Sequence, residues 1–450
     1  MFDTVLIANR GEIAVRIQRA CRQLGLRTVV IHSTADAHCG YVRQADKALC
    51  IGPAPSAQSY LNQAAILLAA EVSGAQAIHP GYGFLSENAS FATAVQEAGL
   101  VFVGPSAASI RAMGDKVAAK RTMQAAGVTC VPGPDQVLSG DLDQLLALAE
   151  SIGYPVIVKA AGGGGGRGMR VVYTAAQFSE AFAVTREEAR TAFGNPALYM
   201  EKFFLRPRHI EIQVLCDTHG HAVWLGSRDC SLQRRHQKVM EEAPAAGIDP
   251  GQIAELGERC ASACRAIGYH GAGTFEFLYQ DGAFYFIEMN TRLQVEHTVT
   301  EMVTGIDIVA LQLRIARGEV LGIVQQDISE HGHAIECRIN AEDPETFAPS
   351  PGQITRWDVP GGLGVRIDSH IHTGDVVPPN YDSLIAKLVT HGATRDQALA
   401  RMRVALDEMA VEGIRTNIAL HRKLLQDVGV AAGGIDTHYL ERMLKTRVAS

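Results

Sequence analysis

Two glutamates lie inside strongly apolar stretches of the sequence, and their carboxylates are the first candidates for chemistry. Glu276 lies within "GTFEFLY" and Glu288 within "FYFIEMN". An ionised carboxylate among aromatic side chains costs several kcal/mol unless a partner compensates its charge. Mg²⁺ is commonly held by one or two carboxylates together with the phosphates of a substrate. The pair therefore predicts a divalent-metal site beside a polyphosphate.

The turn between the two stretches decides whether these acids can share a metal. A two-residue turn, "DG", would pair Glu276 with Ile287 and place the acids on opposite faces of a hairpin. A three-residue loop, "DGA", would set Glu276 opposite Glu288 instead. A metal site requires the second register, and Asn290 on the same face would then be a third oxygen ligand.

Polar residues continue at every second position beyond the second acid: Glu288, Asn290, Arg292, Gln294 and Glu296. Such alternation usually marks the solvated face of a strand. This series begins at a predicted metal ligand and contains both a cation and an acid, so we expect a catalytic wall. The stretch "HIEIQV" has a similar face that carries His209, Glu211 and Gln213, although His209 has an ordinary hydrogen-bonded histidine as its alternative.

The stretch "KAAGGGGGRGMRVV" places five consecutive glycines after an apolar strand. Ordering glycine costs more backbone entropy than ordering any other residue, so the run needs a reason. A linker would have polar flanks, a dinucleotide-binding turn would be followed by a helix, and a Walker motif would contain Gly-Lys-Ser or Gly-Lys-Thr. None of these features is found at this glycine run. A hairpin whose loop N–H groups cover a polyphosphate fits better. Lys159, at the end of the first strand, is placed to reach the same phosphates, although most lysines are simply exposed.

The elements that position these residues follow from hydrophobic periodicity. The first hundred residues alternate apolar runs such as "TVLIA", "RTVVIH" and "LVFVG" with amphipathic stretches, which predicts a parallel α/β layer. "NRGEIA" lacks the three-glycine fingerprint, so a Rossmann-like scaffold is favoured over nicotinamide binding. The pattern changes from about Asp115, strands dominate residues 200–300, and a third unit begins after about Gly332.

Composition limits the possible partners. The 450 residues exceed the size of a single core and predict about three domains. The formal net charge of −7 gives no general attraction for nucleic acid. We find no membrane-spanning run and no signal-peptide pattern, so we expect a cytoplasmic protein that does not enter a membrane. Nine cysteines without repeated C-x-x-C spacing argue against a disulfide framework or a zinc site.

Several long motifs, in this order, resemble those of biotin carboxylase: "IANRGEIAVRI", "HPGYGFLSEN", "MGDK", the glycine run, "SLQRRHQK", "GTFEFL", "FIEMNTRLQVEH", "ECRINAED" and "PPNYDSLIAK". The resemblance covers nearly the whole chain. It implies an ATP-grasp enzyme of the α/β class, α+β overall. Its domains would be a Rossmann-like N-terminal domain at 1–114, an ATP-grasp domain at 115–332 with a lid at about 131–203, and a mixed α/β C-terminal domain at 333–446.

The resemblance also implies roles for individual residues. Those implied in ATP binding are Lys116, Lys159, Gly165, Gly166, Glu201, Lys202, His209, Gln233, His236, Glu276 and Glu288. Those implied in binding Mg²⁺, or Mn²⁺ in its place, are Glu276, Glu288 and Asn290. Those implied in holding bicarbonate or biotin are Lys238, Arg292, Gln294, the Val295 backbone and Arg338. The implied catalytic residues are Arg292, Glu296, Lys238 and Arg338, with Glu296 as the base for bicarbonate and Arg338 as the stabiliser of the biotin enolate.

The implied reaction is the ATP-dependent carboxylation of biotin by bicarbonate, through carboxyphosphate, with ADP and phosphate as further products. No lysine has the "MKM" context of biotin attachment. We therefore expect a separate biotin carboxyl carrier protein, a carboxyltransferase elsewhere, and a homodimer of this chain. The parent complex could be acetyl-CoA carboxylase, which makes malonyl-CoA for fatty acid synthesis, a wider acyl-CoA carboxylase, or a two-subunit pyruvate carboxylase.

Two positions depart from the family pattern. Thr298 stands where "EHPVTE" usually has proline, and Phe204 replaces an aliphatic residue near the lid hinge. Neither change removes a reacting group, so we expect activity. Another ATP-grasp ligase and a nucleotide-binding regulatory protein without turnover are the competing interpretations.

Overall fold

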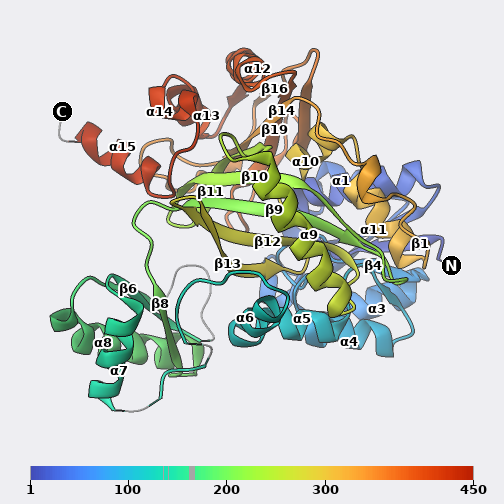
Figure 1. Ribbon diagram of the computed structural model, residues 1–450. Helices are drawn as coiled ribbons and strands as arrows, with labels where there is room; N and C mark the ends of the chain where they lie inside the picture. The colour runs from blue at the N-terminus through green and yellow to red at the C-terminus, as the bar shows by residue number, and fades with distance from the viewer. Residues whose placement is uncertain (1, 135, 140, 162–167, 449–450) are drawn as a thin grey trace.

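Two large sheets form the body of the protein, and a smaller sheet projects from it (Figure 1). The structure, a computed structural model, describes residues 2–134, 136–139, 141–161 and 168–448. Within this part of the chain, no helix is long and apolar enough to cross a membrane.

The N-terminal sheet is parallel, as predicted, with the strand order β3-β2-β1-β4-β5. Ile13 and Ile17 of its first helix are buried one turn apart, which explains why the apolar stripe of this segment folds as a helix against the sheet. The edge strand β3, which is half exposed, was not predicted. The strands are β1 (Thr4–Ile7), β2 (Arg27–Ser33), β3 (Lys47–Gly52), β4 (Ala77–His79) and β5 (Val101–Phe102), and the helices are α1 (Gly11–Gln23), α2 (Gly40–Arg43), α3 (Gln63–Ser73), α4 (Ala89–Glu97) and α5 (Ala107–Gly114).

The central sheet has the order β13-β12-β9-β10-β11-β14-β19-β17 and continues without a break past residue 332, because β11 pairs with β14. Helix α9 packs on β9 and β10 so closely that a Cβ on Gly257 would lie 2.3 Å from the Trp224 ring. The strands are β9 (Arg208–Cys216), β10 (Ala222–Arg234), β11 (Gln237–Ala243), β12 (Gly271–Gln280), β13 (Ala283–Asn290), β14 (His333–Asn340), β17 (Val365–Ser369) and β19 (Leu384–Gly392).

The projecting sheet has the order β7-β6-β8 and lies apart from the central sheet, at the lower left of Figure 1. It has its own small core, in which Val158, Phe178 and Met200 are completely buried. The predicted hairpin is confirmed, since β6 and β7 pair antiparallel on either side of the glycine run. The glycines Gly165 and Gly166 lie outside the described residues. This lid comprises α7 (Leu142–Ile152), β6 (Val156–Ala160), β7 (Met169–Val172), α8 (Ala175–Phe193) and β8 (Leu198–Lys202).

Further helices connect and cover these sheets. Helix α10 packs against β10, β11 and β14, so it covers one face of the sheet at its middle strands, whereas α15 lies at the end of β10 (Figure 1). The remaining elements are α6 (Lys116–Ala125), α9 (Pro250–Ala266), α10 (His297–Thr304), α11 (Ile308–Ala316), β15 (Gly352–Gln353), β16 (Arg356–Asp358), β18 (Val376–Val377), α12 (Arg395–Glu408), β20 (Ala410–Glu412), α13 (Ile418–Leu424), α14 (Val428–Ala432) and α15 (Tyr439–Val448).

Candidate active site

The β12–β13 hairpin sets the two predicted metal-binding acids opposite each other. Its turn has only two residues, Asp281 and Gly282, both with positive φ (53° and 79°), as a type I′ turn requires. Glu276 nevertheless pairs with Glu288, because Ile287 has no partner in the ladder and forms a bulge. The predicted pairing is confirmed, but its predicted cause, a three-residue loop, is wrong.

The predicted wall of alternating polar residues does not continue as a strand to Glu296. Strand β13 ends at Asn290, and a loop leads from there to α10. The chain leaves the ladder because the Glu87 carboxylate accepts hydrogen bonds from the backbone N–H of Thr291 at 3.0 Å and from Nε of Arg292 at 2.8 Å. The wall therefore consists of a strand end and a loop.

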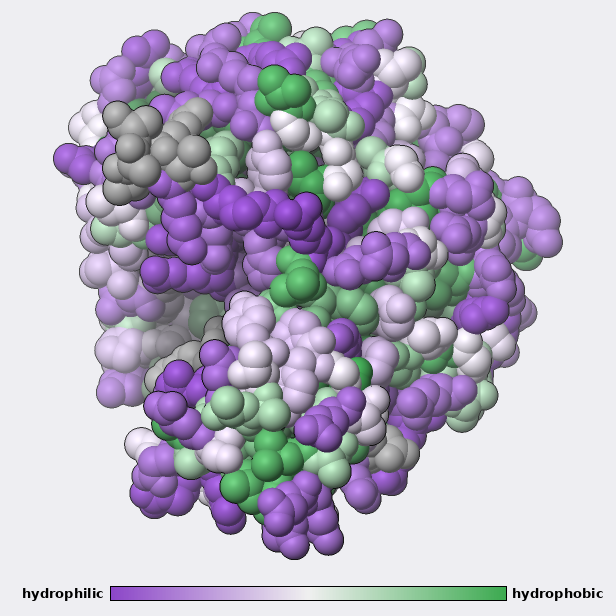
Figure 2. Space-filling model, turned by 60° about the vertical axis from the view of Figure 1, so that its left-hand side comes forward, coloured by the Kyte–Doolittle hydropathy of each residue, from purple (hydrophilic) through white to green (hydrophobic). Residues whose placement is uncertain are grey.

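One cavity of about 1250 Å³ brings the predicted site residues together. It lies where the N-terminal sheet, the lid, the central sheet and α15 meet. Figure 2 shows the surface hollowed between an upper and a lower part of the molecule, with hydrophilic residues bordering the hollow from above. All predicted site residues in the described part of the chain line this cavity: Lys116, Lys159, Glu201, Lys202, His209, Gln233, His236, Lys238, Glu276, Glu288, Asn290, Arg292, Gln294, Val295, Glu296 and Arg338.

Lys238, on β11, is the electrostatic centre of the cavity. Its Nζ donates to Glu296 Oε1 at 2.6 Å, to Glu276 Oε1 at 3.1 Å and to Glu211 Oε1. Burial lowers the pKa of Lys238, but the three carboxylates outweigh burial and raise this pKa well above its ordinary value. Burial conversely raises the pKa of Glu296, but the charges of Lys238 and Arg338 lower it to about 2. Glu296 is therefore ionised at neutral pH and can accept a proton.

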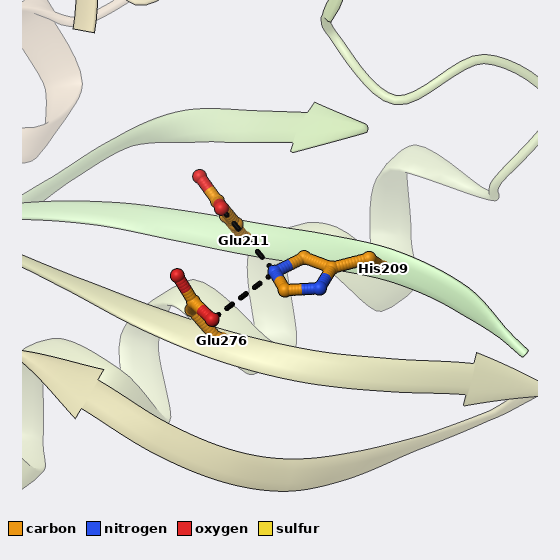
Figure 3. A group of neighbouring side chains, drawn as sticks. All are labelled: His209, Glu211 and Glu276. Carbon is orange, nitrogen blue, oxygen red and sulfur yellow. Dashed lines mark ion pairs between the residues drawn. The ribbon is translucent and has the colours of Figure 1, made fainter. Parts of the chain in front are cut away.

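His209 points its Nε2 between two carboxylates (Figure 3). Nε2 lies 3.3 Å from Glu211 Oε1 and 3.2 Å from Glu276 Oε2. Burial lowers the pKa of His209, but the charge of Glu276 and the close contacts with both acids raise it to about 9. The imidazole is thus a cation at neutral pH. These three residues also have metal-ligand spacing, and a metal ion bound there would have to displace the imidazole proton.

The acids on the hairpin fit a magnesium ion chemically. Glu276 is buried, and the charges of Lys238 and His209 outweigh its burial and lower its pKa, so it is held as a carboxylate. Glu288 is 41% exposed on the cavity side. Two carboxylates and an amide oxygen form the hard donor set that Mg²⁺ prefers. Asn290 directs its Nδ2 to Glu276 at 2.8 Å and its Oδ1 to Arg292 at 2.7 Å, so its amide must turn before it can be a third ligand.

Arg338, on β14, is fixed between two acids. Its Nε donates to Glu241 Oε1 at 2.6 Å, and its Nη2 donates to Glu296 Oε2 at 3.0 Å. Glu241 pairs in the sheet with Glu336, which is fully buried. Burial and the neighbouring charge of Glu241 raise the pKa of Glu336 well above its ordinary value. Burial also raises the pKa of Glu241 to about 7, although the charge of Arg338 favours its ionised form.

The basic residues predicted to hold phosphates also have carboxylate partners. Lys116, at the start of α6, lies 3.4 Å from Glu288. Lys159, at the end of β6, donates to Glu201 on β8. Lys202 donates to the carbonyl oxygens of residues 153 and 154 at 2.8 and 3.0 Å, which ties the end of β8 to the start of β6. The two lysines predicted to hold phosphates thus line the cavity from the body and from the projecting unit.

The two departures from the family pattern make contacts of their own at or near the cavity and replace no reacting group. The Thr298 hydroxyl donates to Glu336, which a proline could not do. The Phe204 ring packs against Tyr285, with ring centroids 4.6 Å apart. Both observations agree with the expectation that neither change removes a reacting group.

Several residues that line the cavity or bind its lining side chains were not predicted from the sequence to have a role. Glu211 was noted only as part of a strand face, and Tyr82 and Glu87 only as letters of a motif. Glu241 and Arg228 belong to none of the motifs that carried the sequence-based expectations. Arg228 follows the apolar run of "HAVWLGSRDC", and a charged side chain within such a strand is the signal that could have identified it.

Comparisons with known proteins agree with this architecture. Three family models match the chain: the biotin carboxylase N-terminal domain at residues 1–110, the carbamoyl-phosphate synthase L chain ATP-binding domain at 115–324, and the biotin carboxylase C-terminal domain at 336–442. The biotin carboxylase of Pseudomonas aeruginosa is 61% identical, over 99% of this chain and 99% of that protein. A pyruvate carboxylase subunit of Methanothermobacter thermautotrophicus is 49% identical, over 98% of this chain and 90% of that protein.

Solved structures are similarly close. The biotin carboxylase of Campylobacter jejuni, described as a β-γ-ATP complex, has a TM-score of 0.95 and 48% identity, and the match covers 98% of this chain and 99% of that chain. The biotin carboxylase domain dimer of Hydrogenobacter thermophilus 2-oxoglutarate carboxylase, in complex with MgADP, ADP and bicarbonate, has a TM-score of 0.93 and 47% identity, with 98% of each chain covered. The chain is an ATP-grasp ligase that belongs to the biotin carboxylase family.

Proposed function

We propose that this protein carboxylates biotin on a separate carrier protein, with ATP and bicarbonate, as the first half-reaction of a biotin-dependent carboxylase. The observation that carries the proposal is the meeting of Glu296, Lys238 and Arg338 beside the metal-binding acids in a single cavity. A base, cations for an anionic substrate, and carboxylates for a nucleotide-bound metal are the groups this reaction needs.

In the first step, Glu296 accepts the bicarbonate proton while a bicarbonate oxygen attacks the γ-phosphorus of ATP. A new oxygen–phosphorus bond forms, the bond to the β-phosphate oxygen breaks, and ADP leaves. Lys238 and Arg292 hold the bicarbonate oxygens, together with Gln294 and the Val295 backbone. Mg²⁺ bound by Glu276 and Glu288 would neutralise the phosphate oxygens.

In the second step, the carboxyphosphate formed in this way breaks down to CO₂ and phosphate. The phosphate accepts the N1 proton of biotin, and the biotin nitrogen attacks CO₂. Arg338 stabilises the negative charge on the ureido oxygen of biotin, since its guanidinium is already oriented by Glu241 and Glu296. Closure of the lid over the cavity would keep water away from carboxyphosphate.

The nucleotide roles rest on the walls of the same cavity. Lys116 and Lys159 face the phosphates from the body and the lid. The backbone of Glu201 and Lys202, at the end of β8, would meet the adenine ring, with Gln233, His236 and His209 along the nucleotide. The glycines at 165 and 166 would cover the phosphates.

The partners proposed for this chain are a biotin carboxyl carrier protein, a carboxyltransferase and a second copy of the chain. Acetyl-CoA carboxylase is the parent enzyme that we propose, with a wider acyl-CoA carboxylase and a two-subunit pyruvate carboxylase as the alternatives, since a pyruvate carboxylase subunit is among the relatives at 49% identity. The solved domain dimer supports a homodimer. Purification of the chain from its native cell and identification of the co-purifying biotinylated protein would test the parent enzyme.

The reaction itself is tested by ADP release. We expect ADP formation to require bicarbonate and biotin together, in the presence of Mg²⁺. ADP formation that depends on an amine or a purine instead would contradict the proposal and favour another ATP-grasp ligase. ATP binding without ADP release under any of these conditions would favour a regulatory protein.

A further inference from the structure

Arg228 lies beneath the cavity and has no role in the reaction described above. It belongs to β10, and its side chain is completely buried, with 0% exposure. Each of its five N–H groups donates a hydrogen bond. The acceptors are Glu211 Oε2 at 2.8 Å, Gln213 Oε1 at 2.7 Å, Thr300 Oγ1 at 3.0 Å, Thr274 Oγ1 at 3.0 Å and Gln294 Oε1 at 2.5 Å.

The chemistry of the guanidinium constrains everything around it. An arginine side chain has five donors and no acceptor, and it keeps its charge at any physiological pH. Each atom that faces Arg228 must therefore be an acceptor. Gln294 can satisfy this only by presenting its amide oxygen, because the opposite orientation would set its NH₂ group against another donor without access to water.

The fixed orientation of Gln294 determines what the cavity offers to an anion. With its oxygen on Arg228, Gln294 turns its Nε2 in the other direction, where it donates to Glu276 Oε1 at 2.7 Å. This is the group that would donate to a bicarbonate oxygen. If the amide were reversed, Gln294 would present an oxygen to the bicarbonate anion and repel it.

Arg228 also holds the second donor of the anion site. Its Nε binds one oxygen of Glu211, and the other oxygen of Glu211 accepts from Lys238. Lys238 is therefore held by a carboxylate that is itself fixed from below. A single buried cation thus orients both the amide and the ammonium group that face bicarbonate.

We propose that Arg228 is a positioning residue for bicarbonate, which acts through Gln294 and Glu211 without touching the substrate. The proposal rests on the proposed function, because it assumes that bicarbonate binds at Gln294 and Lys238. It predicts a specific defect in bicarbonate affinity when the planar, five-donor geometry is lost while the charge is kept.

The test is the substitution Arg228→Lys. Lysine keeps the charge, but its three donors radiate from one atom and cannot reach five acceptors around a plane. We expect the KM for bicarbonate to rise by at least about tenfold, which corresponds to about 1.4 kcal/mol, while the KM for ATP changes by less than about twofold. On a Gln294→Ala background, Arg228→Lys should raise the KM for bicarbonate by a smaller factor than it does in the wild type, because one of the two groups through which Arg228 acts is gone.

The matched control is Arg208→Lys. Arg208 is also a buried arginine of the same sheet, and it binds Asp229 and the Ala246 carbonyl oxygen outside the anion site. Its substitution should leave the KM for bicarbonate unchanged. An equal rise for both variants, or equal effects of Arg228→Lys on the KM for ATP and for bicarbonate, would show a merely structural role and overturn the inference.

A second variant covers the case in which Arg228→Lys does not fold. Thr274→Val removes one acceptor of the Nη2 group that binds Gln294 and leaves the charges in place. We expect a rise of a few-fold in the KM for bicarbonate, and an unchanged value would overturn the inference. If the wild-type protein itself lacks bicarbonate-dependent ADP release, the proposed function fails; if the wild type has it and both variants keep the normal KM, only the role of Arg228 fails.

Discussion

Replacing Glu296 by glutamine should abolish most biotin-dependent ADP formation while the protein stays folded. Glutamine has nearly the same shape but cannot accept the bicarbonate proton. General-base catalysis contributes about 10²–10⁴-fold to a rate. We therefore expect kcat to fall by that factor, which corresponds to about 3–5 kcal/mol in the activation free energy.

The contacts of Glu296 show why stability should suffer less than activity. Its carboxylate binds Lys238 and Arg338, but Lys238 keeps Glu211 and Glu276 after the substitution, and Arg338 keeps Glu241. No buried cation loses its last partner. We expect the free energy of unfolding to fall by about 1–3 kcal/mol, the scale of a charged hydrogen bond, and not by the 3–5 kcal/mol of an isolated buried charge.

The assay is ADP release with biotin and bicarbonate, combined with calorimetric titration of ATP and thermal unfolding. Glu319→Gln is the control, because it removes a carboxylate whose partner, Arg314, is exposed. A Glu296→Gln variant that keeps kcat within about threefold of the wild type would refute the role of the base. Because the pKa of Glu296 is lowered to about 2, this carboxylate should also contribute no acid limb to the pH profile of free enzyme above about pH 4.

Three further substitutions test other parts of the structure. Glu276→Gln should raise the Mg²⁺ concentration for half-maximal ADP release by at least about tenfold, and an unchanged requirement would exclude Glu276 as a ligand. Glu336 has a raised pKa in the folded state, so above the unfolded value of 4.5 the folded protein keeps a proton that the unfolded chain releases, and stability falls as pH rises. Glu336→Gln, which mimics the protonated acid, should remove this loss, so that its unfolding free energy relative to wild type grows by about 1.4 kcal/mol per pH unit as the pH rises from 4.5 towards the raised pKa of the folded acid, in urea titrations at a series of pH values; a constant difference would contradict the raised pKa of Glu336. Gly257→Ala, which forces a Cβ to within 2.3 Å of the Trp224 ring, should lower the unfolding free energy by about 1–3 kcal/mol in thermal unfolding. The control Ser262→Ala, on the exposed side of α9, should change the unfolding free energy little in the same experiment.

The sequence predicted the chemistry of the β12–β13 hairpin better than its geometry. Apolar flanks around Glu276 and Glu288 were enough to pair the two acids. The bulge at Ile287 could not be predicted, because a bulge and a longer loop shift the register by the same one residue. The positive φ of Asp281 and Gly282 distinguishes a two-residue turn with a bulge from a three-residue loop. An Asp-Gly pair is the usual sequence of the two-residue turn, so the sequence did favour it.

Contacts between residues far apart in the sequence limited the prediction of the polar wall after Glu288 and of the N-terminal sheet. Period-two alternation continued to Glu296, but Glu87, some 200 positions earlier in the chain, ends β13 at Asn290 through contacts that no local pattern contains. The unpredicted strand β3 contains the short apolar run "ALCI", but it lies half exposed at a sheet edge, where β2 is its only strand neighbour among the described residues. Local sequence thus identified buried elements and charged residues among apolar ones, whereas their partners came from the fold.

The charges of the cavity divide into two groups that serve binding and positioning. Lys116 and Arg292 are 29% and 22% exposed, and each binds a carboxylate that is itself about 40% exposed. Such pairs are weak in high dielectric, so phosphate or bicarbonate oxygens can replace the carboxylates at little cost. Arg228 and Glu211 are completely buried, and breaking their ion pair would leave an uncompensated charge without water. Lys116 and Arg292 at the rim can therefore exchange their carboxylate partners for substrate oxygens. The buried Arg228–Glu211 pair beneath them stays fixed, and it keeps Gln294 and Lys238 directed towards the substrate.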